Sequence, residues 1–340
     1  MTMAAKTAGF SAATPRPRAS STAAGPRRPA ADPLHGAVAV AALSGAALLA
    51  LASPAIEGRL VEGAGAALLV GAALIGVPHG SSDFVVAYRV MRPSLGWRWL
   101  PCFLALYLAL VGLTLAAWWV APLPTLLGFL AISGLHFGWG DLRSGGGRAS
   151  PGLAFAVRAT TPILPIFLIH PAGVAGFIAA LGGVAQGSVL QVLLALRWPL
   201  LLPWAAALLA VALPPLLARS APRAETRAAT ELGAIALAAA ALPPLLAFGL
   251  YFCLVHAVRH MLDLAEEVFP RRPGPAALLA AAVVVPSGLA CLAVLYWTWD
   301  GLGGVLGTDA LITWGLRIVA ALTVPHMVLE GAAARWAGRS

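Results

Sequence analysis

Charge is the first thing that this sequence has little of. Asp, Glu, Lys and Arg make up 10% of its 340 residues, against roughly 25% in a soluble globular domain. Hydrophobic residues make up 60%, and the mean hydropathy is +0.87. A soluble fold of this length could not hide so much apolar side chain, because its surface needs polar groups. The composition excludes disordered and collagen-like chains and predicts a polytopic membrane protein.

Cysteine is also scarce, and several metal motifs are missing. Cys102, Cys253 and Cys291 lie apart in apolar runs without C-x-x-C spacing, which disfavours a disulfide framework and a thiolate metal site. The sequence has no H-E-x-x-H motif, so a zinc protease is disfavoured. Seven histidines with a single H-x-x-x-H pair are too few for a membrane di-iron oxygenase.

Much of the net charge of +9 lies near the N-terminus. Residues 1–34 carry five basic residues against Asp32 and are rich in Pro, Ala, Ser and Thr, which predicts a disordered leader on the cytoplasmic side. No basic fold follows it, so we expect no nucleic-acid partner. We expect a transmembrane domain at 35–332, a cytoplasmic tail at 333–340, and a multi-pass protein of the cell inner membrane with its N-terminus in the cytoplasm.

Long apolar runs predict an all-α fold, a transmembrane bundle of about eight to ten helices, since one crossing takes about 20 residues. The runs are 36–53, 61–78, 99–120, 124–140, 151–169, 196–217, 228–242, 245–269, 275–298 and 310–330. Basic residues follow the second, fourth and sixth runs, which places those loops on the cytoplasmic side. Ten helices fit this charge pattern. Eight or nine remain open because 228–242 is short.

Five of the seven histidines come to a similar depth in this topology. A histidine inside a span is costly unless it faces the bundle interior and finds a partner, so each is a candidate functional residue. His256 and His260 are four residues apart, share one helix face and could bind one ion. The others are His79, His136 and His326. This convergence predicts one shared site, although polar side chains that only join helices remain an alternative.

Carboxylates follow these histidines at short spacing. Metal-binding imidazoles usually donate their other N–H group to a carboxylate or a carbonyl. Asp83 follows His79 by four residues and Asp141 follows His136 by five, so both could orient a ligand or pair with Arg259. The residues expected around the ligands are Asp83, Asp141, Arg259, Asp263, His326 and Glu330.

An imidazole-only set of ligands suits some metals better than others. Mg and Ca prefer oxygen ligands, whereas Fe(II), Cu or a haem suits imidazole. Fe(II) held by neutral imidazoles with an open coordination position can bind dioxygen. A metal-dependent oxygenase and a haem-binding or metal-transporting membrane protein are therefore both open at this point.

Four stretches around these histidines resemble the Brp/Blh family of β-carotene 15,15′-dioxygenases, integral membrane enzymes that form retinal. They are Gly76 to Asp83, Leu135 to Asp141, His256 to His260 and Thr323 to Met327, in the order of the family. The resemblance covers residues 76–330, nearly the whole membrane part. Ser81 and Ser82 depart from the usual pair of an alanine and a hydrophobic residue, which puts substrate detail in doubt more than metal binding.

The resemblance implies a non-haem Fe(II) site with four ligands, and it leaves His326 outside that set. The implied ligands are His79, His136, His256 and His260. It also implies cleavage of the central 15,15′ double bond of β-carotene by O₂ to two molecules of all-trans-retinal, in the lipid bilayer. A rhodopsin that accepts retinal would be a partner.

Aromatic residues next to the implied ligands are expected to line the polyene site. They are Phe137, Trp139 and Phe252. Cleavage of another carotenoid or apolar polyene remains an alternative, as does a non-enzymatic haem-binding or metal-transporting role.

Overall fold

The computed structural model describes residues 33–53, 79–80, 82–141, 150–268 and 308–337. Within these ranges the chain is helical and contains no strand, in agreement with the all-α prediction. The helices are α1 (Pro33–Ala52), α4 (Asp83–Leu95), η2 (Gly96–Arg98), α5 (Trp99–Val120), α6 (Pro122–Asp141), α7 (Pro151–Thr160), α8 (Leu164–Ile169), α9 (Pro171–Gly182), α10 (Gln186–Leu217), α11 (Arg223–Ala241), α12 (Pro244–Leu250), η3 (Tyr251–Ala257), α13 (Val258–Val268) and α15 (Thr308–Ala337).

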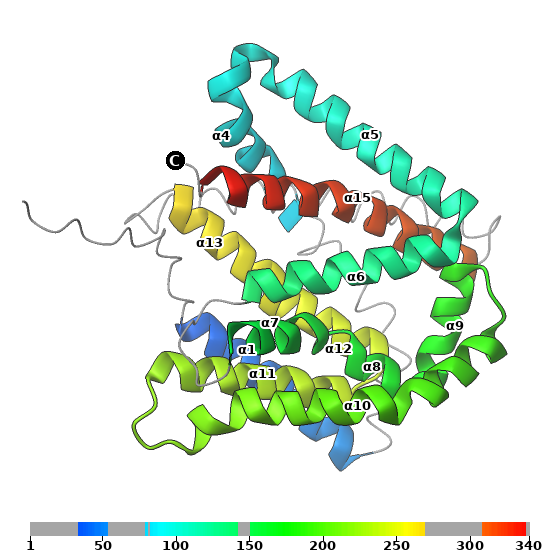
Figure 1. Ribbon diagram of the computed structural model, residues 1–340, viewed down its shortest axis with the longest axis vertical. Coiled ribbons are helices and arrows are strands. Elements are labelled where there is room, and N and C mark those ends of the chain that lie inside the picture. Colours follow the sequence, from blue (N-terminus) through cyan, green and yellow to red (C-terminus); the bar gives the residue numbers. More distant parts are fainter. Residues whose placement is uncertain (1–32, 54–78, 81, 142–149, 269–307, 338–340) are drawn as a thin grey trace, which may run out of the picture.

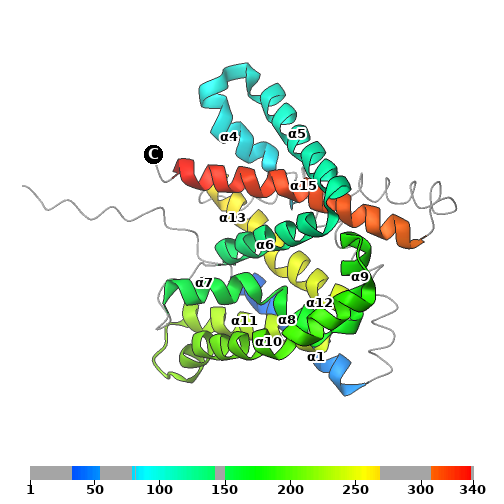
Figure 2. The same cartoon turned by 45° about the vertical axis from the view of Figure 1, so that its right-hand side comes forward.

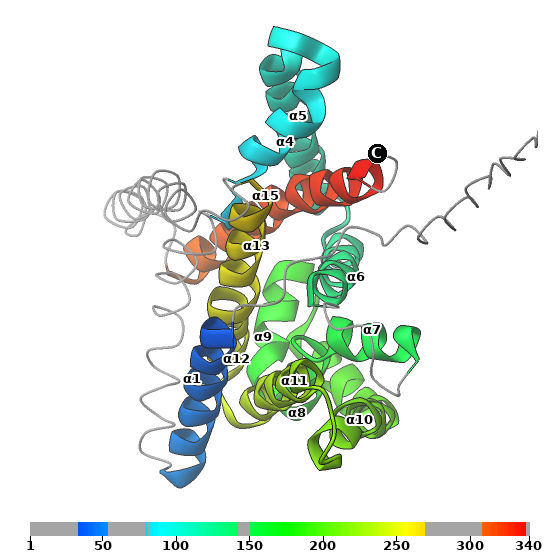
Figure 3. The ribbon, with the colours of Figure 1, turned by 90° about the vertical axis from the view of Figure 1, so that its left-hand side faces the viewer.

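One nearly continuous rod, made of α12, η3 and α13, runs through the middle of the molecule (Figure 1). Helices α6 and α15 cross this rod, α4 and α5 lie above it in the same view, and α10 and α11 lie below it. Helix α1 lies behind the rod in the view of Figure 1 and packs against α11 and η3, as Figures 2 and 3 show. The central rod is thus covered on several sides by long apolar helices.

Among the residues that the structure describes, six helical segments are long and apolar enough to cross a membrane. They are Pro33–Ala52, Asp83–Val120, Pro122–Asp141, Gln186–Leu217, Pro244–Leu264 and Thr313–Ala333. In the apolar stretch of each of these helices, only 6–44% of the residues are buried inside the protein. Most of their apolar surface therefore faces outward, where lipid would cover it. The chain is therefore a multi-pass membrane protein.

Several predicted spans differ in detail from the helices observed. The run 151–169 is divided into α7 and α8 by a turn at 161–163, where Pro162 and Pro165 interrupt the backbone hydrogen bonds. The run 228–242 lies in α11, which is not among the six candidate spans because its first half carries charged residues. The predicted spans 61–78 and 275–298 lie outside the described residues, as do the leader 1–32 and residues 338–340.

Small residues bring the helices into close contact. Alanines of α11 pack against Ala39, Leu43 and Ala50 of α1. On α6, a Cβ atom added to Gly138 would lie 2.8 Å from the Cβ of Ala159 at the end of α7, closer than real Cβ atoms approach. Gly134 and Gly138 therefore form a G-x-x-x-G contact that lets α6 lie against α7.

The central rod is irregular where the histidines begin. Pro243 and Pro244 end α11 and start α12, because proline suits the first turn of a helix but not its interior. The next segment, η3, is a π-helix over Tyr251–Ala257. Such π-helical turns are rare and often occur at functional sites. His256 lies in η3 and His260 one turn later in α13, so the irregular segment carries part of the predicted site.

Candidate metal centre

Five histidine rings from separate parts of the chain meet in the core. His79 lies just before α4, His136 on α6, His256 on η3, His260 on α13 and His326 on α15. The ring centroid of His79 lies 5.9, 5.7 and 4.9 Å from those of His256, His260 and His326. The five histidines expected at one shared site are thus brought together across 247 residues of chain (79 to 326).

The local chain explains how His79 and His136 reach this place. The Ser82 hydroxyl donates a hydrogen bond to the His79 carbonyl and the Ser82 backbone N–H does the same over 3.2 Å, so the turn into α4 is closed on His79. His136 lies between Gly134 and Gly138, the residues that let α6 approach α7. His256 then lies opposite, and the centroids of the two rings are 4.9 Å apart.

The ring spacing fits a shared metal ion. An imidazole nitrogen binds a divalent metal at about 2.1 Å, so two rings on one ion have centroids about 4.5 to 6.4 Å apart. For six of the ten pairs of rings in the cluster, the centroid distance lies between 4.9 and 5.9 Å. The Nε2 atoms of His136 and His256 face each other at 3.1 Å. The donor set, imidazoles without a carboxylate, suits iron, copper or zinc better than magnesium or calcium.

The ring orientations are a different matter. In the part of the chain that the structure describes, no group of three or more His, Cys, Asp or Glu side chains is arranged so that it could hold a metal ion. The χ2 angle of histidine has broad preferences, so rotation of the rings, without movement of the helices, could bring more nitrogens toward one point. The backbone has gathered the rings, and the metal site implied by the sequence remains a prediction.

Asp83 contacts a different histidine from the one suggested by its spacing. Its Oδ1 atom lies 2.6 Å from Nδ1 of His326, 243 residues away in sequence. Asp83 lies at the start of α4 and points toward α15, which packs against α4. The four-residue spacing from His79 therefore did not identify this partner, which the packing of α4 against α15 brings close.

Asp141 belongs to an ion-pair network beside the histidine cluster. Arg259 donates hydrogen bonds of 2.5 Å to Asp141 and of 2.5 Å to Glu231, and the Tyr251 hydroxyl donates one of 2.9 Å to Asp141. The pairing of Asp141 with Arg259, one of the two roles predicted for it, is thus observed. Because Asp141 ends α6 and Arg259 lies between His256 and His260 in sequence, the pair joins two helices that carry histidines.

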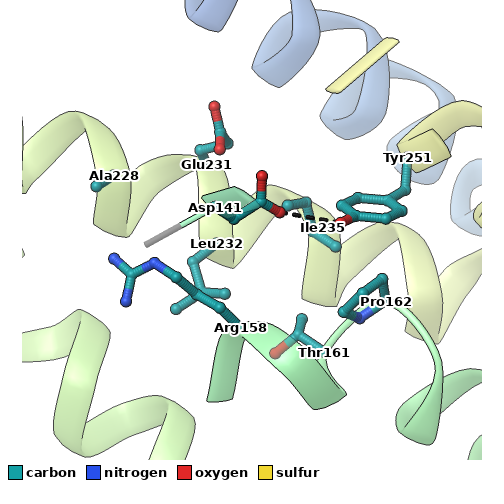
Figure 4. A pocket seen from close by; sticks show the side chains of 9 residues that line it. All are labelled: Asp141, Arg158, Thr161, Pro162, Ala228, Glu231, Leu232, Ile235 and Tyr251. Carbon is teal, nitrogen blue, oxygen red and sulfur yellow. Dashed lines mark hydrogen bonds between the residues drawn. The ribbon is translucent and has the colours of Figure 1, made fainter. Parts of the chain in front are cut away.

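A small cavity lies next to this network (Figure 4). Asp141, Glu231 and Tyr251 line it together with Arg158 of α7. Arg158 donates a hydrogen bond of 3.1 Å to the Ala154 carbonyl in its own helix. The positive charges of Arg158 and Arg259 therefore balance the negative charges of Asp141 and Glu231. We assign the cavity to this network, which joins helices.

The aromatic residues expected to line a substrate site divide into two groups. Phe252 contacts His79 edge-on at 5.3 Å and stacks on His256 at 5.9 Å, and Phe137 lies 4.7 Å from His256. Trp139 is 59% exposed and packs on Phe155 of α7, 5.0 Å away. Phe137 and Phe252 thus border the histidine cluster, whereas Trp139 lies on the outer face of α6.

The remaining predicted neighbours lie on α13 and α15. Glu330 Oε1 is 3.6 Å from Nε2 of His260. Asp263 is half-buried on α13, three residues after His260. Sequence reasoning missed Glu231 and Tyr251 as partners of Asp141 and Arg259. A carboxylate in the otherwise apolar stretch 228–242 was the available signal for Glu231.

The chain is similar to known β-carotene dioxygenases along most of its length. Residues 70–333 match the family model described as beta-carotene 15,15′-dioxygenase. A probable beta-carotene 15,15′-dioxygenase Blh of Halobacterium salinarum is 29% identical over 314 residues, which cover 85% of this chain and 90% of the relative. A beta-carotene 15,15′-dioxygenase of an uncultured marine bacterium is 25% identical over 279 residues, 79% of this chain and 93% of the relative.

No solved structure matches the chain. The family model covers more than three quarters of the sequence, including all five clustered histidines. It therefore includes the four stretches on which the resemblance was based. The chain belongs to the β-carotene 15,15′-dioxygenase family of carotenoid-cleaving membrane enzymes.

Proposed function

We propose that this enzyme cleaves the central 15,15′ double bond of β-carotene with O₂ on a non-haem iron. One C=C bond of the C40 polyene breaks, both atoms of one O₂ are incorporated, and two C20 aldehydes, all-trans-retinal, result. No further reductant is needed, because the four electrons taken up by O₂ come from the cleaved double bond.

The observation that carries this proposal is the buried cluster of five histidines inside an apolar bundle. A C40 carotene is insoluble in water and about as long as the hydrocarbon core of a bilayer, roughly 30 Å. A site between membrane helices can receive such a molecule from lipid. The bundle buries the rings of His79, His256 and His326 to 5% exposure or less, so water has little access to them.

Four histidines, His79, His136, His256 and His260, would hold the iron. Fe(II) held by neutral imidazoles supplies the binding and activation of O₂. The chain supplies the position: Phe252 and Phe137 border the imidazoles with flat apolar surfaces on which a polyene could lie. The reaction requires no general acid or base, so the carboxylates at the cluster can pair with His326 and His260.

The ion pair of Asp141 and Arg259 supports this role from outside the cluster. It fixes the end of α6 against α13, and therefore fixes His136 relative to His256 and His260. Buried hydrogen-bonded charges of this kind hold one arrangement of helices, because separating them would leave a charge without a partner. Asp141 and Arg259 act as positioning residues.

The charge distribution supports an orientation with the N-terminus in the cytoplasm. Arg219, Arg223 and Arg227 are exposed at the connection from α10 to α11. In Figure 1 this connection lies toward the left, as do the ends of α13 and α15, whereas the turn from α5 to α6 lies toward the right. Under the positive-inside rule the left side would face the cytoplasm of the cell membrane.

The test is expression in a bacterium that makes β-carotene, with pigment and retinoids analysed by chromatography. The wild-type enzyme should replace the orange pigment with retinal, and His256→Ala should leave β-carotene unchanged. His170→Gln is the matched control, because His170 lies outside the cluster and contacts the Ala239 carbonyl.

Two results would contradict the proposal in different ways. Unchanged β-carotene in cells that contain iron-loaded, inserted enzyme would move the reaction to another carotenoid or polyene. Retinal formation by the His256→Ala enzyme would remove the histidine cluster from catalysis.

A further inference from the structure

His326 lies among the four histidines that the family resemblance assigns to iron. Its ring centroid is 4.9 Å from that of His79, 5.3 Å from that of His136 and 5.3 Å from that of His260. Among the recorded ring contacts, His260 meets only His79 of the other three implied ligands, and His136 meets only His256. His326 therefore gives His136 and His260 a second neighbouring ring in the cluster.

Asp83 pairs with one ring nitrogen of His326 and leaves the other for a further partner. The carboxylate is 2.6 Å from Nδ1, so in the neutral ring Nδ1 carries the proton and donates it to Asp83. Nε2 then keeps its lone pair. This is the arrangement by which carboxylates orient metal-binding imidazoles in proteins.

The Nε2 atom of His326 has no hydrogen-bond partner in the part of the chain that the structure describes, although it is fully buried. The residue as a whole is 2% exposed. A histidine that only joined helices would be expected to pair both nitrogens, because a buried polar atom without a partner is costly. His170 and His35, which lie outside the cluster, each place one ring nitrogen 3.1 and 2.6 Å from a backbone carbonyl, and within the described residues neither has a buried ring nitrogen without a partner.

We infer that His326 is a fifth imidazole ligand of the metal, oriented by Asp83. The inference rests on the proposed function, since it concerns the same metal, and it enlarges the four-histidine set. It also gives a role to Asp83. This carboxylate is 2% exposed and pairs with His326 on α15. The ligands would then come from every helix that meets at the cluster, α15 included.

Metal binding by the full-length enzyme in detergent tests this inference without depending on turnover. Co(II) is a suitable probe, because its visible absorption reports the number and type of its ligands. The variants are His326→Ala, His326→Gln and Asp83→Asn, with His170→Gln as the control outside the cluster and His256→Ala as the loss of an implied ligand. Gln and Asn keep much of the side-chain volume, so they remain informative if the alanine variant does not fold.

We expect His326→Ala and His326→Gln to lower Co(II) and Fe(II) affinity by at least about tenfold and to change the cobalt spectrum. Asp83→Asn should lower the affinity by about 10–100-fold, the range for carboxylates behind a metal ligand. Combining Asp83→Asn with His326→Gln should add little, because both act on one ligand. His170→Gln should bind metal as the wild type does.

The inference is overturned if both His326 variants keep the wild-type metal affinity and cobalt spectrum while His256→Ala loses them. That result would leave the four-histidine site and the proposed function intact and make His326 a helix-joining residue. A wild-type enzyme that binds neither metal would overturn the proposed function and this inference together.

Discussion

Two polar clusters lie side by side in the core, and they differ in how their groups are paired. In the ion-pair network, Arg259 bonds both Asp141 and Glu231, and Tyr251 completes Asp141. In the histidine cluster, Asp83 pairs with His326 and Glu330 lies 3.6 Å from His260, while the rings also contact each other and Phe252. Inside a membrane, paired charges hold helices together, whereas several imidazole rings gathered at one place in apolar helices indicate a functional site.

The largest expected effect separates the two clusters by function. His256→Ala removes a ring that contacts His79 and His136, so bound iron and retinal formation should both be lost. The protein should still insert, because α12, η3 and α13 keep their apolar surface. Iron content by mass spectrometry and membrane fractionation measure the two outcomes. Full activity in this variant would mean that the cluster is structural.

Breaking the ion-pair network should act mainly on stability. Arg259→Met leaves Asp141 and Glu231 buried without their partner, which should cost about 3–5 kcal/mol. Replacing all three groups by apolar residues of similar size should recover much of that loss. Thermal unfolding in detergent is the measurement. Equal stability of the single and triple variants would show that the charges are solvated and the network is not buried as described.

Phe252 and Trp139 test which side of α6 the substrate contacts. Phe252→Ala removes a ring that lies against His79 and His256, so kcat/KM for β-carotene should fall by about tenfold or more, as a large apolar contact is worth about 1–3 kcal/mol. Trp139→Ala, on the outer face of α6, should change it less than about twofold. Assays in mixed micelles with a series of carotene concentrations distinguish the two. The reverse order would place the polyene on the outer side of α6.

The smallest effect should come from Tyr251→Phe. This change removes one hydrogen bond of 2.9 Å to Asp141, while Arg259 still pairs with that carboxylate. Stability should fall by about 1 kcal/mol, and iron content should stay at the wild-type value. Unfolding midpoints and metal analysis of the purified variant check both. Loss of iron would show that Tyr251 acts on the metal centre and not only on the network.

The helical spans could be read from the sequence because a bilayer imposes a length and a composition on each crossing. The run 99–120 coincides with α5, and 124–140 lies within α6. Prolines were harder to read: α10 runs through Pro199, Pro203 and Pro214, whereas Pro162 marks a break between α7 and α8. Whether a proline interrupts a membrane helix depends also on the helices packed around it, which can satisfy the freed backbone groups.

The sequence by itself determined the class of fold and singled out the histidines that the structure gathers, because polar residues in apolar spans are costly and so stand out as candidates. The tertiary structure decided their partners. Asp83 is nearest in sequence to His79 but binds His326, and Arg259 takes both Asp141 and Glu231. Those pairings depend on how α4 meets α15 and how α6 and α11 meet α13, and no spacing along one helix contains that information.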